Sequence, residues 1–184
     1  MKAGMKAFGF AGYSGAGKTT LLEALIPRFV AAGLRVSLLK HAHHHFDIDR
    51  PGKDSFRLRE AGCAEVLLVS GQRWALMHEL RGAPEPSFEE QLARFSDCDL
   101  VLVEGFKSMN IPKLEVHRPS VGKPLIASPV SDGHGGYADQ IVAIATDEAE
   151  AVGQIAQGMQ RPILPLDQPG RIAEFILRYH GFKS

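Results

Sequence analysis

The chain has 184 residues, a length that suits one domain with a single hydrophobic core. Lysine and arginine together number 21, and so do aspartate and glutamate, so there is no basic excess to hold a nucleic-acid backbone or an anionic membrane. No apolar run approaches the roughly 20 residues of a membrane-spanning helix. Cys63 and Cys98 have no paired-motif spacing, which indicates reduced thiols in a cytoplasmic protein.

Segments typical of strands alternate with segments typical of helices. In chain order we expect a strand over residues 7–11, a helix over 17–32, a strand over 35–40, a helix over 55–61, strands over 65–70 and 74–78, a helix over 87–95, strands over 100–103 and 113–117, irregular chain over 118–138, a strand over 141–145, a helix over 148–157, a strand over 163–166 and a helix over 170–179. This alternation predicts an α/β fold in three layers, a mostly parallel sheet flanked by helices, as one domain over residues 1–184.

The motif GYSGAGKT, residues 12–19, fits the phosphate-binding (Walker A) pattern G-x-x-x-x-G-K-[ST] at every fixed position, between a predicted strand and a predicted helix. Glycines let successive backbone N–H groups point at phosphate oxygens, and the helix N-terminus presents its unpaired N–H groups to the same anion. Lys18 can reach the β- and γ-phosphates, and the Thr19 hydroxyl can coordinate Mg²⁺. We therefore predict a P-loop nucleotide site formed by Gly12, Ser14, Gly15, Ala16, Gly17, Lys18, Thr19 and Thr20.

A second acidic group for the Mg²⁺ should stand at the carboxyl end of a neighbouring strand, because parallel α/β sheets bind ligands at that edge. The segment DLVLVEG offers Asp99 and Glu104. At the usual rise per strand residue they lie about 17 Å apart, at opposite ends of the strand. We therefore predict Glu104 as the residue near the metal and Asp99 as a turn residue at the entry to the strand.

The stretch KHAHHHFDIDRPGKDS begins at the end of the second predicted strand, so it should emerge on the phosphate side of the sheet. Asp47 and Asp49 would then lie near the γ-phosphate and the metal, as catalytic candidates that act on the Mg²⁺ shell or on the attacking water. Asp49 is the preferred candidate of the two. The alternative is that both are solvent-facing loop carboxylates.

The same stretch contains four histidines, which raises the possibility of a zinc or iron site. Such a site needs four converging ligands, or three and a water. His43, His44 and His45 are adjacent, and consecutive side chains of an extended chain point to opposite faces, so they converge only with an unusual turn. We therefore expect no dedicated transition-metal site, and the role of these histidines and of His41 stays open.

Several segments together resemble the MobB family, the molybdopterin-guanine dinucleotide biosynthesis adapter proteins. They are GYSGAGKTTLLEALIP, KHAHHHFDIDRPGKDS, QRWAL, LVLVEGFK, AIATD and PILPLD, and they cover roughly residues 7–180. The run K-H-x-H-H-x-x-D-x-D-x-P-G-K-D-S is far more specific than the P-loop, which many families share. The additional histidine at position 45 is a small departure.

The resemblance implies a homodimeric GTP-binding accessory protein of molybdenum cofactor biosynthesis, with weak Mg²⁺-dependent GTP hydrolysis. It implies that the protein assists the guanylyltransferase MobA, which joins GMP to molybdopterin, so GTP, MobA and molybdopterin are the expected partners. It also implies that Gly15, Gly17, Lys18 and Thr19 hold the triphosphate. Thr19 and Glu104 would be the residues at the Mg²⁺, and the loop with Asp47 and Asp49 would lie near the γ-phosphate.

Guanine recognition is the part that the residues support least. The N-K-x-D motif that commonly selects guanine is absent, and the nearest string, PKLE at residues 112–115, begins a strand instead of ending one. Asp147 follows a predicted strand and could accept hydrogen bonds from guanine N1 and N2. It is also a natural N-cap for the helix after it. A preference for GTP over ATP therefore rests on the resemblance.

Two other classes of function use the same loop. A P-loop kinase of a small metabolite would need Arg57, Arg59 or Arg73 to clamp phosphates and Asp49 as its base. It would also need a phosphate-accepting substrate, with turnover of roughly 1–100 per second. A pure binding module would bind nucleotide without hydrolysing it.

Overall fold

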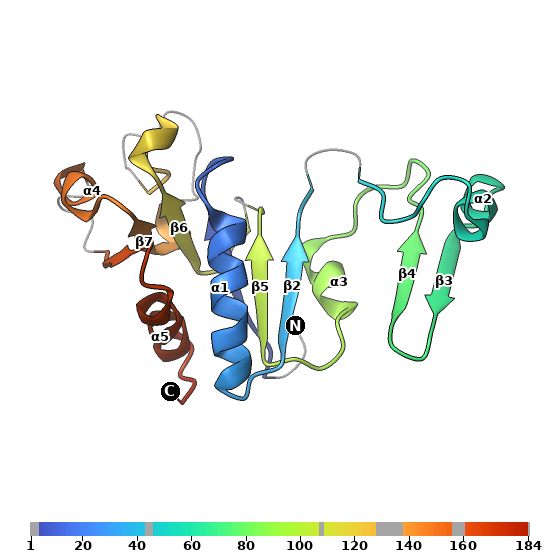
Figure 1. Cartoon of the computed structure of the whole chain (residues 1–184), viewed down its shortest axis with the longest axis horizontal. Coiled ribbons are helices and arrows are strands. Elements are labelled where there is room, and N and C mark those ends of the chain that lie inside the picture. The colour runs from blue at the N-terminus through green and yellow to red at the C-terminus, as the bar shows by residue number, and fades with distance from the viewer. Residues whose placement is uncertain (1–3, 43–45, 107–108, 128–137, 156–160, 184) are drawn as a thin grey trace. The chain divides into compact units, whose positions relative to one another are not determined.

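The computed structural model describes residues 4–42, 46–106, 109–127, 138–155 and 161–183. The chain divides into two compact units, one built from residues 1–41 and 91–184 and the other from residues 42–90. Each unit contains its own sheet (Figure 1). The single domain expected over residues 1–184 stays a prediction.

The first unit is built on a six-stranded sheet in the order β2-β5-β1-β6-β7-β8, and every neighbouring pair is parallel. The carboxyl ends of its strands therefore lie along one edge, where an α/β sheet binds its ligands. The strands are β1 (Lys6–Ala11), β2 (Val36–Lys40), β5 (Leu100–Glu104), β6 (Lys113–His117), β7 (Ile141–Thr146) and β8 (Ile163–Pro165).

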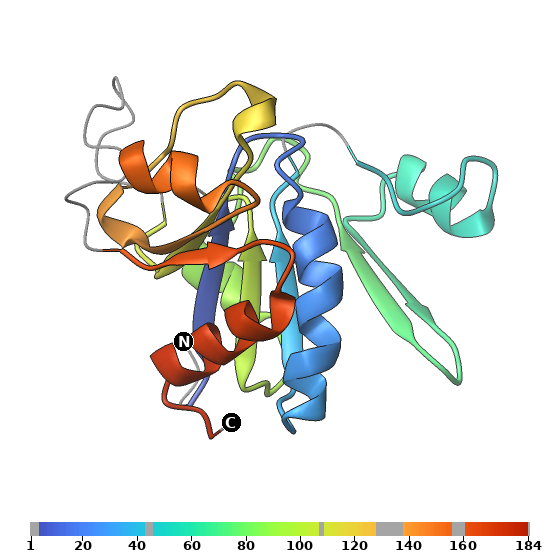
Figure 2. The same cartoon turned by 60° about the vertical axis from the view of Figure 1, so that its left-hand side comes forward.

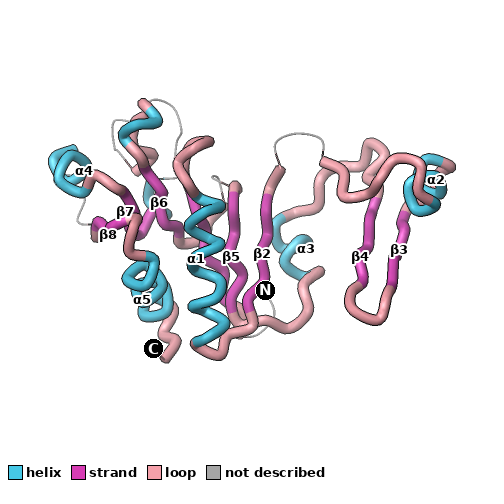
Figure 3. Tube along the Cα trace, viewed as in Figure 1, coloured by secondary structure: helices cyan, strands magenta, loops and turns pink. Residues whose placement is uncertain are grey.

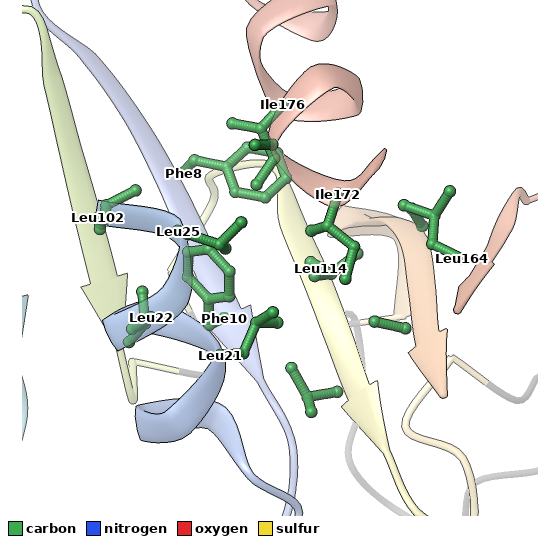
Figure 4. Close-up of a cluster of buried hydrophobic side chains, with 14 of the residues drawn as sticks. Phe8, Phe10, Leu21, Leu22, Leu25, Leu102, Leu114, Leu164, Ile172 and Ile176 are labelled. Atoms are coloured by element: carbon green, nitrogen blue, oxygen red, sulfur yellow. The ribbon is translucent and has the colours of Figure 1, made fainter. Parts of the chain in front are cut away.

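Helices α1 (Lys18–Ala31) and α5 (Pro169–Tyr179) cover one face of this sheet (Figures 1 and 2). Side chains alternate along a strand, so Phe8 and Phe10 of β1 both point to that face. There they pack with leucines of α1 and isoleucines of α5, such as Leu25 and Ile176, in a fully buried cluster (Figure 4). This cluster fixes α1, and with it the loop that precedes α1, against the central strands.

A second apolar cluster joins Ala11, Ile141 and Ile144 of the sheet to residues 125–127 and to Val152 of α4 (Ala149–Ile155). Helix α3 (Phe88–Ala93) contributes the buried side chain of Leu92. The sheet is thus buried between two apolar clusters, as the sequence predicted for an α/β domain with covered strands. The predicted fold class, a mostly parallel sheet flanked by helices, is confirmed.

The second unit consists of the short helix α2 (Asp54–Glu60) and a hairpin of β3 (Glu65–Val69) and β4 (Trp74–His78) (Figure 3). The hairpin is a separate antiparallel sheet. Only residues 70–73 join its strands, and a parallel pair needs a crossover of a dozen or more residues. The sequence predicted both strands but did not separate them from the parallel sheet.

The predicted elements agree with the observed ones to within two residues at each end. One short 3-10 helix, Pro119–Val121, lies within the segment expected to be irregular, and a second, Ala138–Gln140, begins at its last residue. No helix among the described residues is long and apolar enough to cross a bilayer. Cys63 and Cys98 are both free thiols.

Candidate functional site

The loop between β1 and α1 has the backbone that the phosphate-binding motif requires. Gly12, Gly15 and Gly17 adopt φ values of 148°, 83° and 93°, which L side chains rarely tolerate. A Cβ at position 12 would lie 2.5 Å from the Val116 carbonyl oxygen, so only glycine fits there. Gly17 immediately precedes α1, and the loop therefore delivers the chain directly into the helix N-terminus.

Lys18 lies over the loop that it follows. Its Nζ donates to the carbonyl oxygens of Gly12 at 3.0 Å and of Tyr13 at 2.9 Å. The ammonium is therefore held within the loop whose N–H groups would surround a phosphate. This is a position from which a charge-assisted contact to β- or γ-phosphate oxygens needs only a local side-chain movement.

Thr19 and Glu104 meet at the carboxyl edge of the sheet. The Thr19 hydroxyl donates to Glu104 Oε1 at 3.0 Å, and Lys40 Nζ lies 3.2 Å from Glu104 Oε2. Glu104 is 7% exposed, so its carboxylate is buried apart from these contacts. Hydroxyl and carboxylate oxygens are the hard ligands that Mg²⁺ prefers, with water completing its shell. The pair therefore fits the predicted metal position.

Asp99 lies at the opposite end of β5, where it tethers the start of the strand to the chain before β2. Its Oδ2 accepts from the Arg35 backbone N–H at 2.7 Å, and its carboxylate also pairs with the Arg35 guanidinium at 3.4 Å. The backbone hydrogen bond, with the guanidinium, holds the pKa of Asp99 below its ordinary value. Asp99 thus occupies the entry to the strand, at the other end from Thr19.

Asp147 is in contact with an arginine that the sequence did not single out. Arg118 NH1 donates to Asp147 Oδ2 at 2.6 Å, and Arg118 Nε donates to the carbonyl oxygen of Ala16 in the phosphate loop at 3.2 Å. The Glu148 N–H donates to the Thr146 hydroxyl at 3.2 Å, and the helix-capping alternative for Asp147 stays a prediction. The strand-end rule that selected Glu104 would also have found Arg118, the first residue after β6.

Asp47 and Asp49 are held by Arg59 within the second unit. Arg59 NH2 donates to Asp47 Oδ2 at 2.6 Å, and its Nε lies 3.7 Å from Asp49 Oδ2. The Ser55 hydroxyl donates to Asp49 Oδ1 at 2.8 Å. The hydrogen bond from Arg59 is the largest cause of a lowered pKa at Asp47. Both predicted catalytic carboxylates therefore have structural partners, and their role in catalysis stays a prediction.

Arg59 also donates to Glu79 at 2.8 Å, and the hydrogen bonds to Glu79 and then Asp47 raise the pKa of the guanidinium further. This arginine was one of three candidate phosphate clamps for a kinase, and it is engaged with three carboxylates of its own unit. Arg57 is largely exposed beside Asp54 on α2, and Arg73 lies in the hairpin turn. The three arginines do not form one cluster.

Of the histidines, His41 is described and His43, His44 and His45 lie outside the described residues. The His41 backbone N–H donates to the Glu104 carbonyl oxygen at 2.9 Å, and its ring packs on Phe106. A Cβ at Gly105 would lie 2.9 Å from the His41 Cβ, so glycine is needed for this close approach. Within the described part of the chain, no group of three or more His, Cys, Asp or Glu residues could hold a metal ion.

Comparison with known sequences places these features in a family. The family model of molybdopterin guanine dinucleotide synthesis protein B, MobB, matches residues 7–147. A molybdopterin-guanine dinucleotide biosynthesis adapter protein of Haemophilus influenzae is 42% identical over 171 residues, which span 91% of this chain and 85% of that protein. The adapter protein of Escherichia coli is 38% identical over 173 residues, spanning 92% and 90%.

Solved structures agree in fold. Bacillus subtilis MobB has a TM-score of 0.67 at 21% identity and covers 94% of this chain and 96% of its own. A crystal structure of molybdopterin-guanine biosynthesis protein B has a TM-score of 0.62 at 25% identity, with 94% and 99% covered. Hydrogenase maturation factor HypB of Archaeoglobus fulgidus, at 18% identity and a TM-score of 0.51, shares the fold of P-loop type. The family model spans more than half of the chain and both adapter proteins align with nearly all of it, and the chain therefore belongs to the MobB family.

Proposed function

We propose that this chain is a GTP-binding accessory protein for the formation of molybdopterin guanine dinucleotide in molybdenum cofactor biosynthesis, with slow Mg²⁺-dependent GTP hydrolysis. The observation that carries the proposal is the phosphate-type loop with the Lys18 ammonium bound to it, next to the Thr19–Glu104 hydrogen bond at the carboxyl edge of a parallel sheet. The names of two relatives, both biosynthesis adapter proteins, supply the pathway.

Each residue of the site has a defined part in this proposal. The loop glycines and the start of α1 turn backbone N–H groups toward the phosphates, and Lys18 adds a positive charge. Thr19 and Glu104 would hold Mg²⁺, which neutralises charge on the β- and γ-phosphates when bound. Asp47 and Asp49 remain the candidates for positioning water at the γ-phosphate.

Binding should be tested first with Lys18. Lys18→Ala removes the ammonium, together with its hydrogen bonds to the loop carbonyl oxygens of Gly12 and Tyr13. GTP affinity should therefore fall by at least about 1.5 kcal/mol, the low end for a hydrogen bond to a charged group. Calorimetry with purified protein measures the affinity. Lys123→Met, an exposed lysine outside the site, serves as the control. Unchanged GTP affinity in the Lys18 variant would show that this loop is not the nucleotide site.

Hydrolysis separates the proposed function from its two rivals. Radiolabelled GTP should yield phosphate slowly, with Mg²⁺ and without any acceptor molecule. Label transferred to a small metabolite at roughly 1–100 per second would identify a kinase. Bound GTP that stays intact over hours would identify a binding module.

We place a homodimer, MobA and molybdopterin in the same proposal as partners. The hairpin of the second unit supports the dimer. Leu67, Val69, Trp74 and Leu76 lie in opposed pairs on one face of the hairpin and are 43–72% exposed. A two-stranded hairpin is marginally stable alone, and an apolar face of this kind can pair with the same face of a second copy about a twofold axis.

Copurification from cells, scored for nucleotide, pterin and protein, tests the other proposed partners, MobA and molybdopterin.

A further inference from the structure

Arg118 contacts both the phosphate loop and Asp147, two parts of the proposed nucleotide site that are far apart in sequence. It is the first residue after β6, and Asp147 is the first residue after the neighbouring strand β7, one position beyond the paired residues His117 and Thr146. Both therefore emerge at the carboxyl edge of the sheet, beside the phosphate loop that follows β1.

The contacts of Arg118 run in both directions along that edge. Its Nε donates to the Ala16 carbonyl oxygen at 3.2 Å, and its NH1 donates to Asp147 Oδ2 at 2.6 Å. A Cβ at Gly17 would lie 3.4 Å from Nε, so the guanidinium plane rests directly against the loop. These contacts use two of the five N–H donors of a guanidinium and hold the carboxylate at a fixed place relative to the loop.

The arrangement of the strands gives the two ends of a bound nucleotide different surroundings. Glu104, the proposed metal residue, lies on β5, on one side of β1. Arg118 and Asp147 lie on the other side, after β6 and β7. A triphosphate in the loop with its γ-phosphate and metal toward β5 extends its α-phosphate and nucleoside toward β6 and β7.

A carboxylate at that position distinguishes the purines by their hydrogen-bonding edges. Guanine presents two adjacent donors, N1–H and N2–H, whereas the same edge of adenine presents an N1 acceptor that would face the carboxylate unpaired. A carboxylate has about four acceptor positions, so the bond from Arg118 leaves room for both guanine donors. The Asp147 side chain is 35% exposed in the chain alone, so a bound purine would have to cover it. A covered carboxylate that faces adenine without a donor discriminates far more strongly than the loss of an apolar contact.

We propose that the Asp147 carboxylate recognises guanine by accepting from N1–H and N2–H. Arg118 is the positioning residue, because it donates both to this carboxylate and to the Ala16 carbonyl oxygen of the phosphate loop. The inference rests on the proposed nucleotide site and adds its base specificity. Arg118 acts through Asp147 and the loop, so its loss should alter selectivity among nucleotides in addition to affinity.

The test compares GTP, ATP, ITP and XTP binding to purified full-length protein by calorimetry. The wild type should bind GTP more tightly than ATP, and more tightly than ITP, which lacks the N2 amine. Asp147→Asn should weaken GTP at least about tenfold, the value of one hydrogen bond to a charged group. It should strengthen XTP, because an amide can donate to the xanthine O2 and accept from N1–H.

Arg118→Ala should lower the GTP-to-ATP affinity ratio, and Arg118→Lys should restore part of it. Arg178→Ala, which removes an exposed pair with Glu174 on α5, is the matched control for losing an arginine ion pair. Equal losses of GTP and ATP in the Arg118→Ala and Asp147→Asn variants would overturn the proposal. So would a wild type that binds both nucleotides equally, although the phosphate site would then stand. A wild type that binds no nucleotide would overturn the proposed function and this inference together.

Discussion

The Thr19 hydroxyl donates a hydrogen bond to Glu104 Oε1 at 3.0 Å across 85 residues of sequence. Thr19 is the second residue of α1 and Glu104 is the last residue of β5, and the parallel register of β1 with β5 brings them to the same edge. Hydroxyl and carboxylate are then positioned to share one divalent cation. The predictions for the metal follow from this pair.

Replacing Glu104 should affect metal-dependent binding, and replacing Asp99 should not. Glu104→Gln removes a negative charge next to Thr19, so Mg²⁺-dependent GTP binding should weaken by roughly 1–3 kcal/mol. Asp99→Asn removes a charge at the far end of the strand, about 17 Å away. Mg²⁺ titration of GTP binding measures both variants. If only Asp99→Asn weakened Mg²⁺-dependent GTP binding, the metal would bind at the Asp99 end of β5 and the assignment to Glu104 would be wrong.

Lys40 should compete with Mg²⁺ for the Glu104 carboxylate. Its Nζ lies 3.2 Å from Oε2, where it supplies positive charge next to the proposed metal position. Lys40 is half exposed, and exposed pairs contribute up to about 1 kcal/mol, so Lys40→Met should tighten Mg²⁺ binding in the GTP complex by at most about fivefold. Lys123→Met is the control. Weaker Mg²⁺ binding in the Lys40 variant would show that the lysine helps to bind the anion instead.

Asp49→Asn should lower GTP hydrolysis more than GTP affinity, if the loop places this carboxylate at the attacking water. The same carboxylate accepts from Ser55, so the variant also perturbs the loop. Ser55→Ala removes that hydrogen bond without changing the charge and is the matched control. Single-turnover hydrolysis and calorimetry are measured on both. Equal changes in the two variants would mean that Asp49 acts only by holding the loop.

Trp74→Glu should convert the proposed dimer into a monomer, because it places a charge within the apolar face of the hairpin. Light scattering at micromolar concentration should then give half the wild-type mass. Leu58→Glu makes the same kind of change at an exposed apolar residue of α2, outside that face, and should leave the mass unchanged. A wild type of monomeric mass would contradict the homodimer.

Because Lys113 is buried, we expect the free energy of unfolding to rise at alkaline pH. It is 1% exposed, its ammonium donates to the carbonyl oxygens of Met109 and Ile111, and burial lowers its pKa to about 8. Between about pH 8 and the ordinary lysine value the unfolded chain keeps a proton that the folded chain has lost. The free energy of unfolding should therefore rise there, by up to about 1.4 kcal/mol per pH unit.

Denaturant unfolding across that pH range measures the effect. Lys113→Met removes the titrating group, so the rise should shrink, and the Lys123→Met control should keep it. Because the lysine is already charged in both states near neutral pH, its burial is unfavourable there. A slope that is equal in the Lys113 variant and the wild type would show that other groups cause the pH dependence.

The sequence determined the features that depend on local chemistry. GYSGAGKT specifies its own geometry, because three glycines adopt φ values that other residues rarely reach and the helix begins at Lys18. The alternation of strands and helices determined the parallel sheet. The rule that ligands bind at the carboxyl ends of strands separated Glu104 from Asp99, since strand direction alone puts them at opposite ends.

Only the tertiary structure decided which distant residues meet. Arg118 and Asp147 are 29 residues apart and come together because β6 and β7 are neighbours in the sheet, an order that periodicity does not encode. Arg59 gathers Asp47, Asp49 and Glu79 because α2, the loop before it and the hairpin pack around one guanidinium. Local patterns arise from propensities and backbone sterics over a few residues, whereas these contacts depend on strand order and packing across the whole unit.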